Sequence, residues 1–116
     1  KALSLMDLFG DGFNVTDEIT SLLTPGHTPG HMSFLLNSGG QKAAIVGDAI
    51  HSKVQISEPS WCAGVDVDKT ASERSRRDLI QRSVSQGMII AAGHFNPDEH
   101  FGRVHQQDDV TTWQTV

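Results

Sequence analysis

The fold prediction depends on the stretch Thr24-Pro25-Gly26-His27-Thr28-Pro29-Gly30-His31. Proline lacks an amide N–H and fixes φ, and glycine adopts backbone conformations that other residues avoid. The stretch therefore predicts a stiff, turned loop that holds imidazoles in fixed places. Apolar runs at residues 19–23 and 32–36 flank it and predict two strands. A rigid loop between two buried strands is a suitable place for a binding group.

The bulk composition excludes several classes of protein. A length of 116 residues fits one small domain or part of a larger one. A net charge of −5 without a long basic cluster argues against nucleic-acid and acidic-membrane partners. The single Cys62 excludes an internal disulfide framework and a Cys-rich metal site. No apolar run is long enough to span a membrane and no signal peptide is visible, so we expect a soluble protein, cytoplasmic rather than secreted. Because the sequence begins with Lys1, targeting signals can lie outside it.

The expected elements alternate between short strands and a single helix. Apolar residues are dense from residue 3 to 9, and strands are expected at 13–15, 19–23, 32–36, 43–46 and 88–92, with a closing hairpin at 103–105 and 111–116. The strand at 43–46 is continuously apolar, which predicts burial on both faces. Residues 49–67 have no clear period and predict a long loop.

One helix is expected at about residues 69–86. Thr70 and Glu73 have capping-box spacing at its start, and Gly87 is placed to end it. Asp66 and Asp68 precede it as expected turn and capping groups. Its charged residues predict a solvated face; they are Arg74, Arg76, Arg77, Glu73 and Asp78.

Three apolar strands are each followed, within four residues, by a side chain that can bind metal: His27, Asp48 and His94. Ligands gather at the carboxyl ends of strands in α/β folds, and imidazole with carboxylate suits zinc and other divalent metals. Two histidines and one aspartate would be enough for one catalytic zinc with an open position, but too few for two metals. The residues alone leave alternatives open: a histidine after a strand can be a surface or core residue, and an aspartate after glycine a turn residue. The other four histidines are then structural or incidental; they are His31, His51, His100 and His105.

Three segments carry a resemblance to a known family. They are the stretch at 24–31, Ile45-Val46-Gly47-Asp48-Ala49-Ile50-His51, and Ala91-Ala92-Gly93-His94-Phe95. In order and approximate spacing they resemble the second half of a metallo-β-lactamase-fold hydrolase. Trp61, Asp66-Val67-Asp68, Ala71, Arg74 and Arg77 resemble the branch with methyl parathion hydrolase and quorum-quenching lactonases. The resemblance implies an α/β (layered α+β) fold in which residues 1–116 form one partial domain. That domain is the C-terminal half of an αββα sandwich, with one mixed sheet and one main helix.

The resemblance also implies roles for individual residues. His27, Asp48 and His94 match metal ligands, and Asp48 matches the carboxylate that bridges two metals and takes part in catalysis. His31 and His51 match positions that orient the ligands or shape the pocket. The implied cofactor is a divalent metal, with zinc the first choice and two ions in a full-length protein. Trp61 and Phe95 are candidates for lining a substrate pocket, with packing on the core as the alternative for both.

The family's HxHxDH motif, which supplies the other ligands, does not occur in these residues. We therefore expect a hydrolase of a small-molecule ester-type bond, such as a lactone or phosphotriester, that is inactive in this form and binds no metal tightly. The exposed apolar surface predicts association with a second copy or with the missing N-terminal half. Two alternatives stay open. One is a non-catalytic, self-associating module, and the other is a mononuclear site that binds metal without useful turnover.

Overall fold

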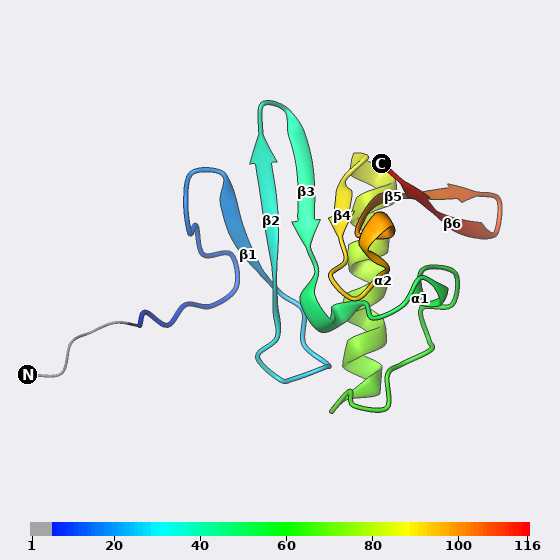
Figure 1. The fold of residues 1–116 in the computed structure, drawn as a ribbon. Helices are drawn as coiled ribbons and strands as arrows, with labels where there is room; N and C mark the ends of the chain where they lie inside the picture. The colour runs from blue at the N-terminus through cyan, green and yellow to red at the C-terminus, as the bar shows by residue number, and fades with distance from the viewer. Residues whose placement is uncertain (1–5) are drawn as a thin grey trace, which may run out of the picture.

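The computed structural model describes residues 6–116, and its apolar runs form one six-stranded sheet (Figure 1). The strands are β1 Ile19–Leu23, β2 Met32–Ser38, β3 Gln41–Ile45, β4 Ile89–Ala91, β5 Phe101–Gln107 and β6 Val110–Thr115. The main helix is α2, Lys69–Gln86, and the shorter elements are η1 Gly47–Ala49, α1 Val54–Ser57 and η2 Pro97–Glu99. The expectation of one mixed sheet with one main helix is confirmed.

The strands lie in the sheet in the order of the chain, from β1 to β6. Every neighbouring pair is antiparallel except β3 and β4, which are parallel and joined by the crossover that contains α2. Since β1 and β3 are both antiparallel to β2, the strands β1, β3 and β4 all run in one direction. Their carboxyl ends therefore meet at one edge of the sheet.

Helix α2 has the expected bounds, and of its two expected N-terminal caps only Asp68 forms. Asp68 is its N-cap residue, and its side chain accepts a hydrogen bond from the Ala71 N–H at 2.9 Å. The capping box expected at Thr70 and Glu73 is wrong, because Glu73 lies one turn inside the helix and pairs with Arg77. Gly87 ends the helix in the left-handed conformation, with φ of 63°.

The core lies between α2 and one face of the sheet. Leu79 and Ile80 of the helix belong to the same buried cluster as Ala44 and Ile90 of the central strands. The rest of the buried helix face is polar: it consists of Ser72, Ser75, Arg76 and Ser83. The expectation that Arg76 lies on a solvated face is wrong, since its side chain is fully buried.

Some sequence expectations about the remaining segments are also wrong. Residues 13–15 form no strand and contribute only an isolated bridge between Asn14 and Thr20. The long loop at 49–67 contains η1 in part and all of α1. The apolar run at 3–9 begins outside the described residues, and its described part, 6–9, has no regular structure. The closing hairpin is confirmed, with Asp108 in its turn at φ of 54°.

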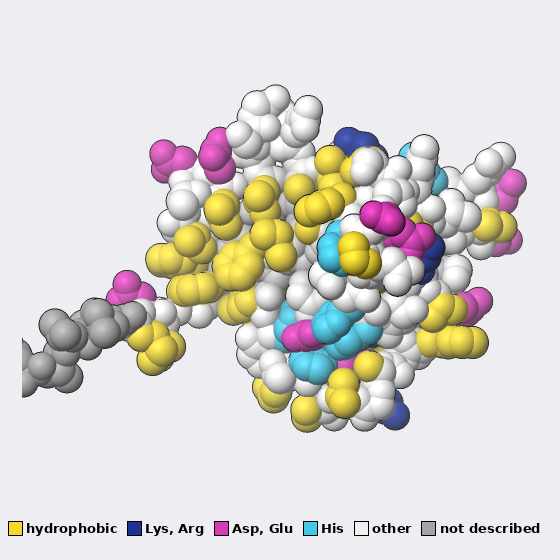
Figure 2. All heavy atoms as spheres, in the orientation of Figure 1, with side chains coloured by type: hydrophobic (Ala, Val, Ile, Leu, Met, Phe, Trp, Pro, Cys, Tyr) yellow, Lys and Arg dark blue, Asp and Glu magenta, His cyan; other side chains and the backbone are white. Residues whose placement is uncertain are grey.

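The second face of the sheet is apolar, and no helix within residues 6–116 covers it. Residues paired across neighbouring strands share a face, and such pairs connect Phe34, Ile45, Ala91 and Phe101 into one row. Ile45 is 47% exposed and Phe101 is 56% exposed, so the strand expected to be buried on both faces is buried on one. Figure 2 shows hydrophobic side chains gathered over β1 to β3 on this face.

No helix within residues 6–116 combines the length and the apolar character that crossing a membrane requires.

The loop after β1 packs closely on the start of α2, which leads to a stability prediction. Gly26 has φ of 141°, and a Cβ added there would lie 2.2 Å from the backbone nitrogen of Ser72. We expect Gly26→Ala to lower the free energy of unfolding by about 3 kcal/mol, measured by urea denaturation, because the helix must move away. A Cβ on Gly30, in the same loop, would have no neighbour within 4 Å. Gly30→Ala is therefore the control, and equal losses in the two variants would contradict the packing argument.

Candidate metal centre

The side chains that follow β1, β3 and β4 converge at one edge of the sheet. Asp48 lies in η1, and its Oδ1 accepts a hydrogen bond from His94 Nε2 at 2.6 Å. His27 Nε2 lies 3.8 Å from the other oxygen of the same carboxylate. The structure thus brings together the three residues that the sequence predicted as metal ligands. The histidines and the carboxylate form one cluster on the surface in Figure 2.

His51 belongs to the same cluster. Its Nε2 lies 3.8 Å from Asp48 Oδ1, and its ring stacks on that of His94 with centroids 4.7 Å apart. The ring centroid of His27 is 5.3 Å away. The Nδ1 of His51 is buried and has no hydrogen-bond partner among the described residues. The sequence predicted a supporting position for His51, and the structure places it among the donor atoms.

His31 lies behind the cluster and supports the Asp48 turn. Its Nε2 accepts a hydrogen bond from the Asp48 backbone N–H at 3.0 Å. Its Nδ1 lies 2.9 Å from the Thr24 hydroxyl and 3.1 Å from the Thr24 carbonyl oxygen, so Nδ1 carries the proton and donates it to Thr24. The Thr24 hydroxyl continues the network to Ser33 at 2.9 Å. His31 therefore ties the loop after β1 to the turn after β3.

The glycine before Asp48 makes this contact possible. Gly47 has φ of 51°, and a Cβ there would lie 2.9 Å from His31 Nε2. Glycine adopts this left-handed conformation at little cost and leaves room for the imidazole. The turn can therefore bring the Asp48 N–H onto His31.

The Nδ1 of His27 is held by a buried carboxylate that the sequence had assigned to a turn. His27 Nδ1 donates a hydrogen bond to Asp66 Oδ1 at 3.2 Å, which leaves Nε2 directed toward Asp48. Asp66 comes from the segment just before α2, and its side chain is 0% exposed. Asp68, by contrast, is the cap that was expected.

Two residues that sequence reasoning missed hold the other loops of the cluster. Gln55 is buried, and its Oε1 accepts the backbone N–H groups of His51 at 2.7 Å and Ser52 at 3.2 Å. Arg76 donates from Nε to the carbonyl oxygen of Ala49, next to Asp48, at 3.0 Å. A polar residue on a predicted loop or helix face gives no local signal of such long-range bonds.

The electrostatics favour the forms that bind metal. The hydrogen bond from His94 holds the pKa of Asp48 below its usual value, against the effect of partial burial. Burial lowers the pKa of His51, and the neighbouring His94 lowers it further. Burial raises the pKa of Asp66, but the hydrogen bonds from Ser72 and His27 outweigh it and leave the pKa below normal. A carboxylate and a neutral imidazole are the states in which these side chains bind metal.

The donor set fits a divalent cation. Within residues 6–116, Asp48, His51 and His94 bring ligand atoms within 4.8 Å of one another, and so do His27, His51 and Asp66. Asp66 is a poor ligand in the second group because its oxygens already accept hydrogen bonds from His27, Ser72 and Ala63. Nitrogen and oxygen donors of this kind suit zinc and its first-row neighbours.

The two aromatic candidates for a substrate pocket lie in different surroundings. Phe95 is 6% exposed, and its ring lies against Trp113 with centroids 4.9 Å apart, so packing accounts for its position. Trp61 is 60% exposed, so it does not pack into the core. Its carbonyl oxygen accepts bonds from Gln55 and Arg76, which places its backbone behind the cluster.

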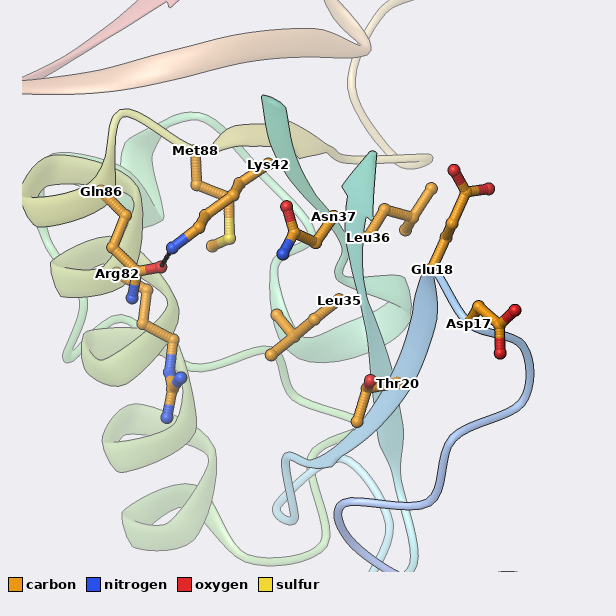
Figure 3. Close-up of a pocket in the computed structure, with 10 residues that line it drawn as sticks. All are labelled: Asp17, Glu18, Thr20, Leu35, Leu36, Asn37, Lys42, Arg82, Gln86 and Met88. Carbon is orange, nitrogen blue, oxygen red and sulfur yellow. Dashed lines mark hydrogen bonds between the residues drawn. The ribbon is translucent and has the colours of Figure 1, made fainter. Parts of the chain in front are cut away.

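A groove of about 290 Å³ lies far from the cluster, between the C-terminal part of α2 and the β2–β3 hairpin (Figure 3). Its lining includes Leu35, Lys42, Arg82 and Gln86. The Lys42 ammonium group already donates a hydrogen bond to Gln86 Oε1 at 3.0 Å. The groove lies at the sheet edge opposite to the histidines and contributes nothing to the metal centre.

The comparisons with known proteins agree with this geometry. A family model described as "Metallo-beta-lactamase superfamily" matches residues 7–94. A search of curated proteins finds no match.

Solved structures with this fold include hydrolases and lactonases. The hydrolase AbOPH is 28% identical with a TM-score of 0.79 over 87% of this chain, and the match covers 35% of AbOPH. AidC, described as a dizinc quorum-quenching lactonase, is 23% identical with a TM-score of 0.82, and the match covers 93% of this chain and 37% of AidC. A B. thuringiensis AiiA variant with N-decanoyl-L-homoserine at its active site is 26% identical with a TM-score of 0.63, over 75% of this chain and 34% of AiiA. This chain therefore spans little more than a third of these proteins.

The hydrogen bonds of His31 lead to a prediction for its removal. We expect His31→Phe to lower the free energy of unfolding by about 1 to 3 kcal/mol, because the Asp48 N–H and the Thr24 carbonyl lose their partner. Urea denaturation followed by circular dichroism measures the loss. His105→Phe is the control, since His105 is exposed on β5. If the two variants are equally stable, His31 does not support the turn.

Proposed function

This chain belongs to the metallo-beta-lactamase superfamily, and we propose that it supplies part of the metal centre of a hydrolase that cleaves ester-type bonds. The proposed substrate is a small molecule such as a lactone or a phosphotriester, and the proposed cofactor is zinc. The observation that carries the proposal is the convergence of His27, Asp48 and His94 at the carboxyl ends of β1, β3 and β4.

The similar structures support the substrate class and the metal. AidC is a dizinc lactonase, and the AiiA variant holds an acyl-homoserine at its active site. AbOPH is described as a hydrolase in the beta lactamase superfamily. Imidazole and carboxylate ligands with an open position for water can hold a catalytic metal, and the cluster offers these side chains at a partly exposed edge.

Each residue of the cluster has a proposed task. A bound divalent metal activates water and polarises the oxygen of the scissile bond. His27 presents Nε2 because Asp66 binds its Nδ1. His94 brings Nε2 to Asp48 from the loop after β4, where a bound metal would replace the proton that Nε2 donates to the carboxylate. Asp48 orients the attacking water with its carboxylate, accepts its proton and passes it to the departing oxygen. His31 holds the Asp48 backbone, and His51 forms one wall of the site.

We further propose that the centre is completed by another polypeptide segment. This chain spans 35% and 37% of two similar hydrolases, and it offers only part of the ligand set that such a centre requires. Its second sheet face, with Phe34, Ile45 and Phe101, is apolar, and the part of the chain that the structure describes provides no covering layer for it. The chain alone is then inactive, and the segment that covers this face carries the remaining ligands.

A second candidate function rests on the same face. A sheet that exposes an apolar row can associate with a copy of itself, and the chain would then act as a self-associating module without turnover. The size of the assembly and its metal content distinguish the two functions. A metal-free oligomer supports the module, and zinc bound by the cluster supports the hydrolase.

Asp48 provides the test of the metal centre. We expect Asp48→Asn to weaken zinc binding by about 100-fold or more, because even the loss of a ligand's hydrogen-bond partner costs ~10–100-fold. Competition with a chromophoric chelator measures the affinity. Asp98→Asn is the control, since Asp98 is exposed in η2. Equal zinc affinities in the two variants would refute the proposed centre.

Hydrolysis can be tested in a chimera in which this chain replaces the matching third of AbOPH. We expect a folded, zinc-loaded chimera to hydrolyse lactones or phosphotriesters and its Asp48→Asn variant to lose that activity. A chimera that folds and takes up zinc but hydrolyses no ester-type substrate would contradict the proposed reaction.

The apolar face leads to a prediction about association. We expect the chain to associate reversibly in sedimentation experiments and Ile45→Glu to shift the equilibrium toward monomer, because an unpaired carboxylate is costly to bury in an interface. Val65 is 68% exposed in the loop before α2, and Val65→Glu is the control. A chain that is monomeric over the whole dilution series, or equal behaviour of the two variants, would argue against this face as an interface.

A further inference from the structure

We infer that Asp66 and Arg76 are positioning residues that together fix the separation of His27 and Asp48. Neither belongs to the proposed ligand set, and the inference rests on the proposed function of that set. It assigns a role to the buried polar network between α2 and the two loops that carry the ligands.

Asp66 determines which nitrogen of His27 faces the site. Its Oδ1 accepts a hydrogen bond from His27 Nδ1 at 3.2 Å, and its Oδ2 accepts from Ser72 Oγ at 2.8 Å and from the Ala63 N–H at 3.2 Å. A carboxylate in this position requires the proton of a neutral His27 on Nδ1. The free lone pair then lies on Nε2, which is the atom that faces Asp48.

Arg76 connects this carboxylate to the turn that carries Asp48. Its Nη2 lies 3.6 Å from Asp66 Oδ2, and its Nε donates to the carbonyl oxygen of Ala49 at 3.0 Å. The remaining terminal nitrogen donates to the carbonyl oxygens of Pro59 and Trp61. The guanidinium is planar and rigid, so the two loops are held at a fixed distance from each other.

Stability alone gives little reason for this pair. Both side chains are 0% exposed, and a buried ion pair often contributes no more to stability than apolar residues of similar volume. One hydrogen bond of each member reaches a ligand-bearing loop: Asp66 accepts from His27 Nδ1, and Arg76 Nε donates to the Ala49 carbonyl oxygen. Outer partners of this kind fix the tautomer and orientation of ligating histidines, and their loss costs ~10–100-fold in metal affinity.

The first test measures the tautomer of His27 in the metal-free wild-type chain. We expect a long-range ¹H–¹⁵N spectrum to show His27 protonated on Nδ1, and Asp66→Asn to reduce the population of this tautomer, since the amide side chain can also donate to the ring. This measurement requires neither zinc nor activity. A wild-type His27 protonated on Nε2 would overturn the inference.

The second test compares zinc affinity by chelator competition in Asp66→Asn, Arg76→Lys and a control. We expect the first two to bind zinc about 10–100-fold more weakly, because lysine cannot bridge both loops as the arginine fork does. Ser83→Ala is the control: Ser83 is 1% exposed on the same helix and bonds the Met88 carbonyl oxygen, away from the site. The control should lose stability and keep its zinc affinity.

The outcomes separate the two proposals. Folded Asp66→Asn and Arg76→Lys variants with wild-type zinc affinity would overturn the positioning role. If a variant does not fold, the tautomer of His27 in the wild-type chain decides whether Asp66 orients that ring. If the wild-type chain takes up no zinc, the cluster does not bind zinc without a further segment, and the tautomer of His27 alone decides whether Asp66 orients that ring.

Discussion

The parallel pairing of β3 with β4 is the constraint on which the site depends. Parallel neighbours require a crossover connection, and this one contains η1, α1 and α2. The pairing places the ends of both strands at the same edge, so Asp48 and His94 meet although they are far apart in the sequence. The same crossover covers one face of the sheet and brings Asp66 and Arg76 up to the ligand loops. The crossover between β3 and β4 therefore determines both the packing of the sheet and the position of the candidate metal ligands.

Most of the fold could be predicted from the sequence because its local signals agree with its final packing. Six of the seven expected strands lie near their expected positions, and α2 has the expected bounds, ended by Gly87. The failures occurred where local pattern and tertiary context diverge. The strand at 43–46 is apolar throughout, yet Ile45 is half exposed, because a sheet with one covering helix buries only one side of each strand. The run at 13–15 stays outside the sheet apart from one bridge.

The candidate site was predictable to the extent that its residues follow strands. His27, Asp48 and His94 carry that signal, and their convergence needed only the strand directions. Asp66 and Arg76 carry none, since a carboxylate before a helix is usually a cap and an arginine on a Ser-rich helix is usually solvated. Their role depends on bonds between segments that are distant in sequence. Buried polar networks of this kind have no periodicity, and for that reason the sequence misassigned both residues.

The turn between β2 and β3 lies at the edge of the sheet opposite to the histidines. Gly39 and Gly40 occupy it with φ of 57° and 78°, and a Cβ added at either would meet no atom within 4 Å. Loop tips of this kind tolerate insertions, since no buried backbone depends on them. Lengthening this turn would leave the ligand loops in place, so the molecule has a natural attachment point for a fluorophore or an affinity handle. The edge of the sheet that carries the histidines is constrained by metal binding, whereas the length and sequence of the β2–β3 turn at the opposite edge can change independently.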